Sequence, residues 1–310
     1  MSKEIQSVSD IISTINNLGE LSSILYFTQK SRSGYTTYAP NVSPSIKDQI
    51  LELIVQDLKK YESYQMKKYS PLGCDDETIE FCKSIDIGGY NEAINSFKDC
   101  DRVETDIDAD QLTFYTLMIE NELNDVKIYF FRRVTKFKRL SSNGIMAYFQ
   151  GYKLVNIESK MLGIDGLVDV IVIKNDAYVI NHISLERIFK MTEQYNEVAI
   201  KALDILKSKN KIMNFKQFED DCLNDMRIQK TLTKIMAEPD VIEHAFDNFD
   251  EIEKTIDMFQ LDLDVVYEQG EKKLCYSESS KELLMRILYI IRDAYYTSTI
   301  QHRKGIDDSR

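Results

Sequence analysis

The feature that most restricts the fold is a series of short strand-like segments between residues 112 and 181. Each segment is rich in Val, Ile, Tyr and Phe, which favour extended backbone. A parallel pair of strands needs a crossover of about a dozen residues or more, and the connections between these segments are shorter. We therefore expect a mostly antiparallel sheet. The predicted strands are 112–119, 127–134, 145–157, 167–173 and 177–181.

The segments on either side of this block complete an α+β pattern. Residues 21–38 predict a hairpin with a serine-glycine turn. A helix over 46–63 follows, with Ser43 as its N-cap and Pro44 in the first helical position. After the sheet, the apolar spacing is mainly helical. The expected fold class is α+β, with an N-terminal mixed region, a central mostly antiparallel sheet and a helical C-terminal half.

The length of the chain predicts more than one region. A single hydrophobic core usually stops growing at about 250–300 residues, and this chain has 310. We expect an N-terminal α+β region over 1–110, which ends in an acidic run, and a second region over 111–310 with the central sheet and the C-terminal helices. The last predicted helix, 279–297, is apolar around most of its circumference, so it should be buried in a core or at an interface.

The composition of the chain indicates the cellular compartment in which it is expected. No stretch approaches the roughly 18 consecutive apolar residues that a membrane span needs. The first residues form no apolar signal segment, so we expect no secretion by that route. The five cysteines are widely spaced and include no CxxC pair for zinc or redox chemistry. We therefore expect a cytoplasmic protein with reduced thiols and without a metal or cofactor.

Charge is distributed unevenly along the chain. The formal net charge is −12, yet residues 126–216 contain 16 Lys and Arg against 8 Asp and Glu, a net charge of +8. The segments before and after it carry −11 and −9. Exposed charges are screened beyond about 8–10 Å at ordinary salt, so a polyanion responds to the local field and not to the total charge.

The clearest functional signal is the basic island, residues 130–140, which contains five cations and three phenylalanines. On a strand, Phe130 and Arg132 share one face while Phe131 and Arg133 share the other. Basic side chains contact phosphates, and an exposed phenylalanine can stack on an unpaired base. The residues expected to contact DNA are Arg132, Arg133, Lys136, Phe137, Lys138 and Arg139, joined by Lys153, Lys160 and Lys174 from neighbouring elements.

Two other roles remain open for the basic island. It can contact an acidic protein surface, either on a partner or on the flanks of its own chain. It can also be a solvated edge hairpin whose lysines oppose aggregation. Charge alone does not distinguish these roles from DNA binding.

Catalytic signatures are mostly absent. The sequence contains no GxGxxG or GxxxxGK[ST] phosphate loop, no GxSxG elbow and no HExxH. Glu158 and Lys160 form an E-x-K triplet that, with Asp125 or Asp106, could hold magnesium as in metal-dependent nucleases, although such triplets are common by chance. The alternating carboxylates of 99–110 are interpreted as a solvated acidic loop. The sequence favours a binding protein over an enzyme, with no catalytic residue and no metal ligand assigned.

One carboxylate stands out because of its surroundings. Asp169 lies within an apolar strand run, where a carboxylate needs a partner. Together with Asp165 and Lys174 it could form a second catalytic set. A buried structural pair with a lysine or an arginine is the favoured interpretation, because lone buried charges are rarely tolerated.

Five segments of the chain share one further property, which is a likeness to a known family. They are 131–133, 163–172, 178–182, 185–189 and 287–298. Together they resemble the KwaB-like family, the soluble subunit of the bacterial Kiwa anti-phage defence system. The resemblance covers about half of the chain, and residues 1–110 contribute nothing to it.

The resemblance implies a cytoplasmic effector that binds DNA, acts with a membrane-embedded partner subunit at the inner membrane face and limits phage DNA replication. No catalytic residue carries over from the family. A homodimer would bring two basic islands together and offset the acidic flanks. The alternatives are a cryptic metal-dependent nuclease and a non-enzymatic scaffold whose acidic flanks dock a membrane partner.

Overall fold

The computed structural model divides the chain into two compact units, one formed by residues 1–69 and 73–191 and the other by 70–72 and 192–310. The expected division after residue 110 falls inside the first unit instead, because strands from both sides of it join one sheet. The structure describes residues 5–19, 21–73, 76–100, 111–121, 126–134, 147–150, 152–156, 163–277 and 280–307.

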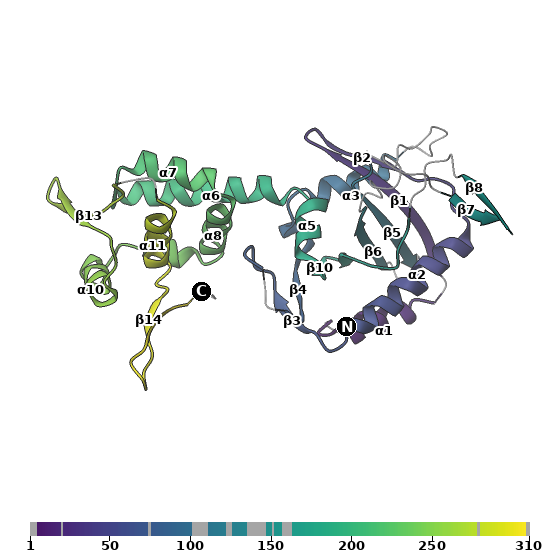
Figure 1. The fold of residues 1–310 in the computed structure, drawn as a ribbon, viewed down its shortest axis with the longest axis horizontal. Coiled ribbons are helices and arrows are strands. Elements are labelled where there is room, and N and C mark those ends of the chain that lie inside the picture. Colours follow the sequence, from purple (N-terminus) through teal and green to yellow (C-terminus); the bar gives the residue numbers. More distant parts are fainter. Residues whose placement is uncertain are drawn as a thin grey trace. The chain divides into compact units, whose positions relative to one another are not determined.

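The first unit is organised around an eight-stranded sheet (Figure 1). Its strands are β1 (Ser22–Ser31), β2 (Gly34–Tyr38), β3 (Gln65–Lys68), β4 (Thr78–Lys83), β5 (Phe114–Asn121), β6 (Val126–Arg133), β9 (Val170–Ile173) and β10 (Asp176–Val179). Their order is β2-β1-β5-β6-β9-β10-β4-β3. Neighbouring strands are antiparallel except β3 and β4, so the predicted mostly antiparallel sheet is confirmed.

The single strand expected over 145–157 is two strands in the structure. β7 (Ala147–Gln150) and β8 (Lys153–Asn156) pair antiparallel and form a separate two-stranded sheet. A strand of the expected length would have exceeded the roughly 3–10 residues that strands usually span. The chain therefore reverses between β7 and β8 and forms a hairpin.

Helices cover both faces of this large sheet. They are α1 (Val8–Asn16), α2 (Pro44–Leu58), α3 (Tyr90–Lys98) and α5 (His182–Ile188), with the short 3₁₀ helices η1 (Lys59–Tyr61) and η2 (Ser84–Asp86). α1 and α2 enclose a core with the face that carries Ile128 and Phe130. On the opposite face, Phe131 contacts the rings of Tyr90 and Phe189, from α3 and the end of α5. The alternation predicted along β6 is therefore confirmed.

The second unit is mainly helical. Its helices are α6 (Met191–Lys209), α7 (Phe215–Asn224), α8 (Met226–Met236), α9 (Pro239–Glu243), α10 (Phe249–Phe259) and α11 (Lys281–Ile291). Its strands are β11 (Ile212–Met213), β12 (Val265–Glu268), β13 (Glu271–Cys275), β14 (Tyr295–Thr297) and β15 (Lys304–Ile306). Ile287, Leu288 and Ile291 are buried, so α11 lies in the core of this unit as expected. It ends earlier than predicted, because the following residues form β14.

Candidate functional site

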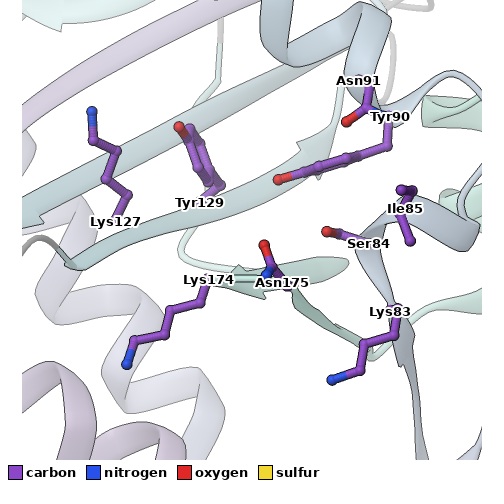
Figure 2. A pocket seen from close by; sticks show the side chains of 9 residues that line it. All are labelled: Lys83, Ser84, Ile85, Tyr90, Asn91, Lys127, Tyr129, Lys174 and Asn175. Carbon is purple, nitrogen blue, oxygen red and sulfur yellow. The ribbon is translucent and has the colours of Figure 1, made fainter.

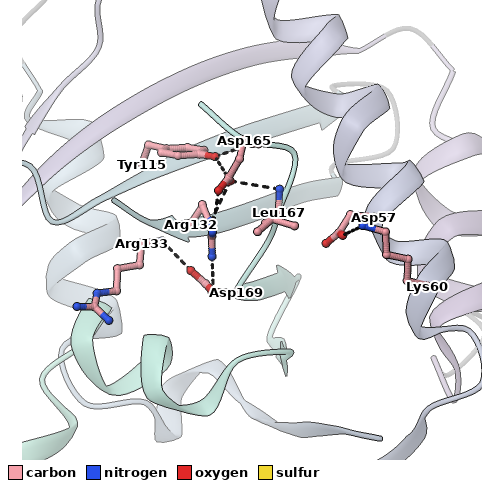
Figure 3. Close-up of polar contacts among 8 residues, drawn as sticks. All are labelled: Asp57, Lys60, Tyr115, Arg132, Arg133, Asp165, Leu167 and Asp169. Atoms are coloured by element: carbon pink, nitrogen blue, oxygen red, sulfur yellow. Dashed lines mark hydrogen bonds and ion pairs between the residues drawn. The ribbon is translucent and has the colours of Figure 1, made fainter. Parts of the chain in front are cut away.

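Arg132 is bound by two carboxylates of its own chain. Its Nη1 donates to Asp169 Oδ1 at 2.9 Å, while Nε and Nη2 donate to the two oxygens of Asp165 at 2.9 and 2.7 Å (Figure 3). The Arg132 side chain is 13% exposed and that of Asp169 only 1%. The fork of the guanidinium matches a carboxylate in this geometry. The interpretation of Asp169 as one member of a buried structural pair is confirmed, and its partner is Arg132.

Backbone and side-chain hydrogen bonds fix both carboxylates. Asp169 Oδ2 accepts from the backbone N–H of Arg133 at 2.7 Å. The Tyr115 hydroxyl donates to the Asp165 carboxylate at Oδ1, 3.1 Å away, and also to the backbone carbonyl oxygen of Asp165 at 2.7 Å. Burial, followed by the charge of Asp165, raises the pKa of Tyr115, so this hydroxyl stays a donor. Burial favours the neutral form of Asp165, but its contacts with Arg132 and Tyr115 outweigh it and lower the pKa of this carboxyl.

A glycine allows the segment that carries Asp165 to approach α2. A Cβ on Gly166 would lie 2.3 Å from the Cβ of Leu53 in α2, closer than any side chain permits. The segment therefore passes directly against α2 while Asp165 contacts Arg132. This glycine belongs to the same run as Asp169, so the ion-pair network depends on local sequence as well as on the sheet.

The expected DNA contact at Arg132 needs correction. Its charge is already balanced by two carboxylates, and moving it toward a phosphate would leave Asp169 buried and unpaired. Such an unpaired charge costs about 3–5 kcal/mol. Arg132 is therefore a structural residue of the sheet, and it leaves the set of candidate DNA contacts.

The other predicted contacts near this end of β6 differ in position. Arg133 is half-buried on the opposite face from Arg132, and its guanidinium is turned away from Asp169 (Figure 3). Lys153 is exposed at the start of β8, directly after Tyr152, whose exposed fraction is 94%. Tyr152 was not among the predicted site residues, and the signal that points to it is its place beside a lysine in a turn. Lys136, Phe137, Lys138, Arg139 and Lys160 lie outside the described residues.

Lys174 lies at the other end of β6. Ile173 pairs with Ile128, so Lys174 continues β9 beside Lys127, whereas Arg133 ends β6 six residues further on. At about 3.3 Å per residue the two ends are roughly 20 Å apart. The predicted single basic patch is therefore divided between the two ends of this strand.

A pocket of about 890 Å³ opens at the Lys174 end (Figure 2). It lies on the sheet face that α3 covers, and its walls come from β4, η2, α3, β6 and the turn between β9 and β10. The lining residues are Lys83, Ser84, Ile85, Tyr90, Asn91, Lys127, Tyr129, Lys174 and Asn175. Only Lys174 was among the predicted site residues. The others are scattered along the sequence, and no local pattern connects them.

Among the residues that the structure describes, Lys83 and Lys127 of the pocket have carboxylate partners, and solvent reaches both pairs. Lys83 pairs with Asp176, with exposed fractions of 62% and 43%. Lys127 pairs with Glu120 at 2.8 Å, with exposed fractions of 46% and 21%. Exposed pairs contribute about 0–1 kcal/mol and exchange partners readily. These lysines therefore differ from Arg132 in how firmly their counterions hold them.

A third charged cluster connects α5 to β4. His182 Nδ1 lies 2.7 Å from Glu80 Oε2, and Nε2 lies 3.3 Å from Glu186 Oε1. The His182 ring stacks on the Tyr69 ring, with 5.3 Å between the two ring centroids. Burial lowers the pKa of His182, but the two carboxylates outweigh burial and raise it to about 9. Glu80 is 4% exposed, so the imidazolium neutralises a buried carboxylate near neutral pH.

The described residues contain neither a group of metal ligands nor a membrane-spanning helix. Within them, no group of three or more His, Cys, Asp or Glu side chains could hold a metal ion. Glu158, Lys160, Asp106 and Asp125 lie outside this part of the chain, so the E-x-K triplet stays a prediction. The helices of the described part include none with the length and hydropathy to cross a bilayer.

The family model described as Kiwa protein KwaB-like matches residues 110–301. The chain belongs to the KwaB-like family. The match includes the basic island, the Asp165–Asp169 segment and α11, so the resemblance inferred from these segments is confirmed. Family membership makes the chain a component of Kiwa anti-phage defence. No curated protein and no solved structure matches the chain.

Proposed function

We propose that this chain is the DNA-binding member of its Kiwa system and that it limits phage DNA replication. The observation that carries the proposal is the turn of the β7–β8 hairpin, where Tyr152 and Lys153 are both exposed. An aromatic ring that is 94% exposed adds almost nothing to packing. It is well suited to stacking on a base while the adjacent ammonium contacts a phosphate.

The charge of the central segment supports the same proposal. Residues 126–216 have a net charge of +8, and Arg132 pairs with Asp165 and Asp169, two of the eight acidic residues in that segment. Without these three residues the segment still contains 15 cations against six acidic residues. The proposed DNA contacts are Arg133, Lys136, Phe137, Lys138, Arg139, Lys153 and Lys160, with Tyr152 as a stacking residue.

Membership of a Kiwa system also supports partner subunits. We propose that one partner is embedded in the membrane and that the chain acts at its cytoplasmic face. The acidic flanks, with net charges of −11 and −9, offer a complementary surface to a basic partner. A homodimer would place two basic islands on one DNA molecule and so raise its avidity.

The test is fluorescence anisotropy with duplex and single-stranded DNA at two salt concentrations, with magnesium present. The wild type is compared with Tyr152→Ala/Lys153→Glu. The control is Tyr267→Ala/Lys201→Glu, which removes another exposed tyrosine and makes the same change in net charge. We expect the wild-type affinity to fall by about one log unit per log unit of salt for each phosphate contacted.

The hairpin variant should bind roughly tenfold or more weakly than the control, because base stacking alone contributes about 1–3 kcal/mol. Intact DNA at the end of the incubation separates binding from cleavage. Absence of binding by the folded wild type at low salt would refute the proposal. Equal affinities of the two double variants would refute the hairpin as the contact surface.

A further inference from the structure

We propose that the pocket at the Lys174 end of β6 binds a nucleoside phosphate. The pocket shares no described residue with the proposed DNA surface, because Arg133 lies at the opposite end of the strand and neither Tyr152 nor Lys153 lines the pocket. Its volume of about 890 Å³ falls within the roughly 300–1,000 Å³ of pockets that bind small organic ligands, and far exceeds what a phosphate ion alone would fill.

The rim of the pocket is suited to a phosphate group. Lys83, Lys127 and Lys174 line it from three different elements, and their ammonium groups point in different directions around its edge (Figure 2). None of the nine lining residues is a carboxylate. Because the pairs of Lys83 with Asp176 and of Lys127 with Glu120 are accessible to solvent, a ligand phosphate can compete for both ammonium groups. Three cations around one opening give it a positive local field, which attracts an anion.

The uncharged residues that line the pocket are suited to a nucleoside. Ile85 on η2 is 75% exposed and offers an apolar surface on which a base can lie. The amides of Asn91 and Asn175 can each donate and accept hydrogen bonds, as the edge of a base requires. The Tyr90 hydroxyl points into the recess (Figure 2). A small anion such as inorganic phosphate would contact the lysines but neither the apolar surface nor the amides.

The hydroxyls of the pocket remain protonated donors at neutral pH. Burial raises the pKa of Tyr90 above its ordinary value, and its hydrogen bond with Ser84 only partly offsets this effect. Burial also raises the pKa of Tyr129, although the charge of Lys127 opposes it. Two neutral hydroxyls beside three ammonium groups make a site for a ligand that carries both a negative charge and hydrogen-bonding groups.

The backbone at Lys174 gives an independent reason to suspect a ligand. Lys174 has a φ of 58°, in the left-handed region that glycine or asparagine usually occupies. The turn is held in place because the N–H of Ser84 donates to the carbonyl oxygen of Asn175 at 2.8 Å. A lysine is an unfavourable residue for this backbone, so its presence points to a role for its side chain.

The same backbone geometry supplies a variant that tests binding without harming the fold. Lys174→Gly removes the ammonium group and relieves the left-handed strain. Gln269→Gly is its matched control, because Gln269 has a φ of 53° at the exposed turn between β12 and β13 and lines no part of this pocket. Lys174→Arg keeps the charge at the same position.

Calorimetric titration of the full chain with dAMP, deoxyadenosine and inorganic phosphate tests the proposal. We expect dAMP to bind more tightly than deoxyadenosine or phosphate. The Lys174→Gly variant should lose roughly tenfold or more in dAMP affinity, as expected for a charge-assisted hydrogen bond. The Gln269→Gly variant should match the wild type, and Lys174→Arg should retain most of the affinity.

The ligand phosphate can come from a free nucleotide or from an unpaired nucleotide of DNA. Competition of dAMP with a duplex that has a single-stranded overhang separates these sources. If Lys174→Gly weakens binding of the overhang, the ligand is an unpaired nucleotide of DNA. If the overhang does not displace dAMP, the ligand is a free nucleotide. Absence of saturable dAMP binding, equal binding of phosphate and dAMP, or full affinity in Lys174→Gly would overturn the proposal, whatever the hairpin variants do to DNA binding.

Discussion

The two ends of β6 carry cations in very different states. At one end, Arg132 is 13% exposed and paired with Asp169, which is 1% exposed. At the other end, Lys127 is 46% exposed and paired with Glu120, which is 21% exposed. A buried carboxylate keeps its cation, because separating them leaves an unsolvated charge. A carboxylate that solvent reaches in part, such as Glu120, regains water when its cation leaves, so that cation can exchange it for a ligand.

This difference shows that a cluster of cations in a sequence combines residues of two kinds. Some of them balance buried carboxylates and belong to the fold. Others face solvent and can serve recognition. The burial of the counterion decides which kind a residue is, and the following predictions test that rule.

The largest expected effect is on stability at the Arg132 end. Arg132→Met should lower the free energy of unfolding by about 3–5 kcal/mol, because the buried carboxylate of Asp169 is left without a cation. Lys127→Met, on the same strand, should change it by less than about 1 kcal/mol. The chain contains no tryptophan, so urea unfolding followed by far-ultraviolet circular dichroism is the suitable measurement. Similar losses in the two variants would contradict the comparison.

A combined variant sharpens this result. Removing all three charges with Arg132→Met/Asp165→Asn/Asp169→Asn eliminates the unpaired carboxylates. The combined variant should therefore be more stable than Arg132→Met alone. If it is less stable, loss of hydrogen bonds and not the buried charge explains the effect of Arg132→Met.

The next effect concerns His182, which pairs with the buried Glu80 as Arg132 pairs with Asp169. Its pKa in the folded protein is about 9, above the ordinary 6.5. The stabilisation is therefore fully present below about pH 6.5 and is lost as the pH rises through 9. The loss between pH 6 and pH 10 should be about 3 kcal/mol in the wild type.

The difference between the wild type and His182→Gln, measured by urea unfolding across this pH range, isolates the contribution of His182. His244→Gln is the control, because His244 is an exposed histidine whose pKa is also raised, by Asp247. The control should lose much less of the wild-type pH dependence, because solvent screens the exposed pair of His244 with Asp247. A His182→Gln variant with that same dependence would show that the pair with Glu80 does not govern it.

The smallest effect belongs to the exposed pair at the pocket. Asp176→Asn removes the carboxylate that competes with a ligand phosphate for Lys83. We expect stability to change by less than about 1 kcal/mol. The affinity for dAMP should rise a few-fold at low salt and less at high salt, because exposed charges are screened. Calorimetric titration at two salt concentrations measures this change, and weaker binding by the variant would count against the phosphate position beside Lys83.

Local sequence patterns determined much of the fold. Val, Ile, Tyr and Phe content and short turns predicted the antiparallel sheet, and the two-residue alternation along β6 correctly assigned Phe130 and Arg132 to one face and Phe131 to the other. These properties depend on neighbouring residues, so they can be read from the sequence. The single carboxylate of Asp169 in an apolar run also correctly predicted a buried ion pair.

Tertiary structure alone decided which residues meet. Arg132 and Asp169 are 37 positions apart, and the register of β6 against β9 brings them together. The same register places Lys174 beside Lys127 and far from Arg133, and thereby divides a basic patch that looked continuous. The physical reason is that the burial of its counterion decides whether a cation stays in an internal ion pair or can bind a ligand. Burial depends on packing between distant segments, which no local pattern encodes.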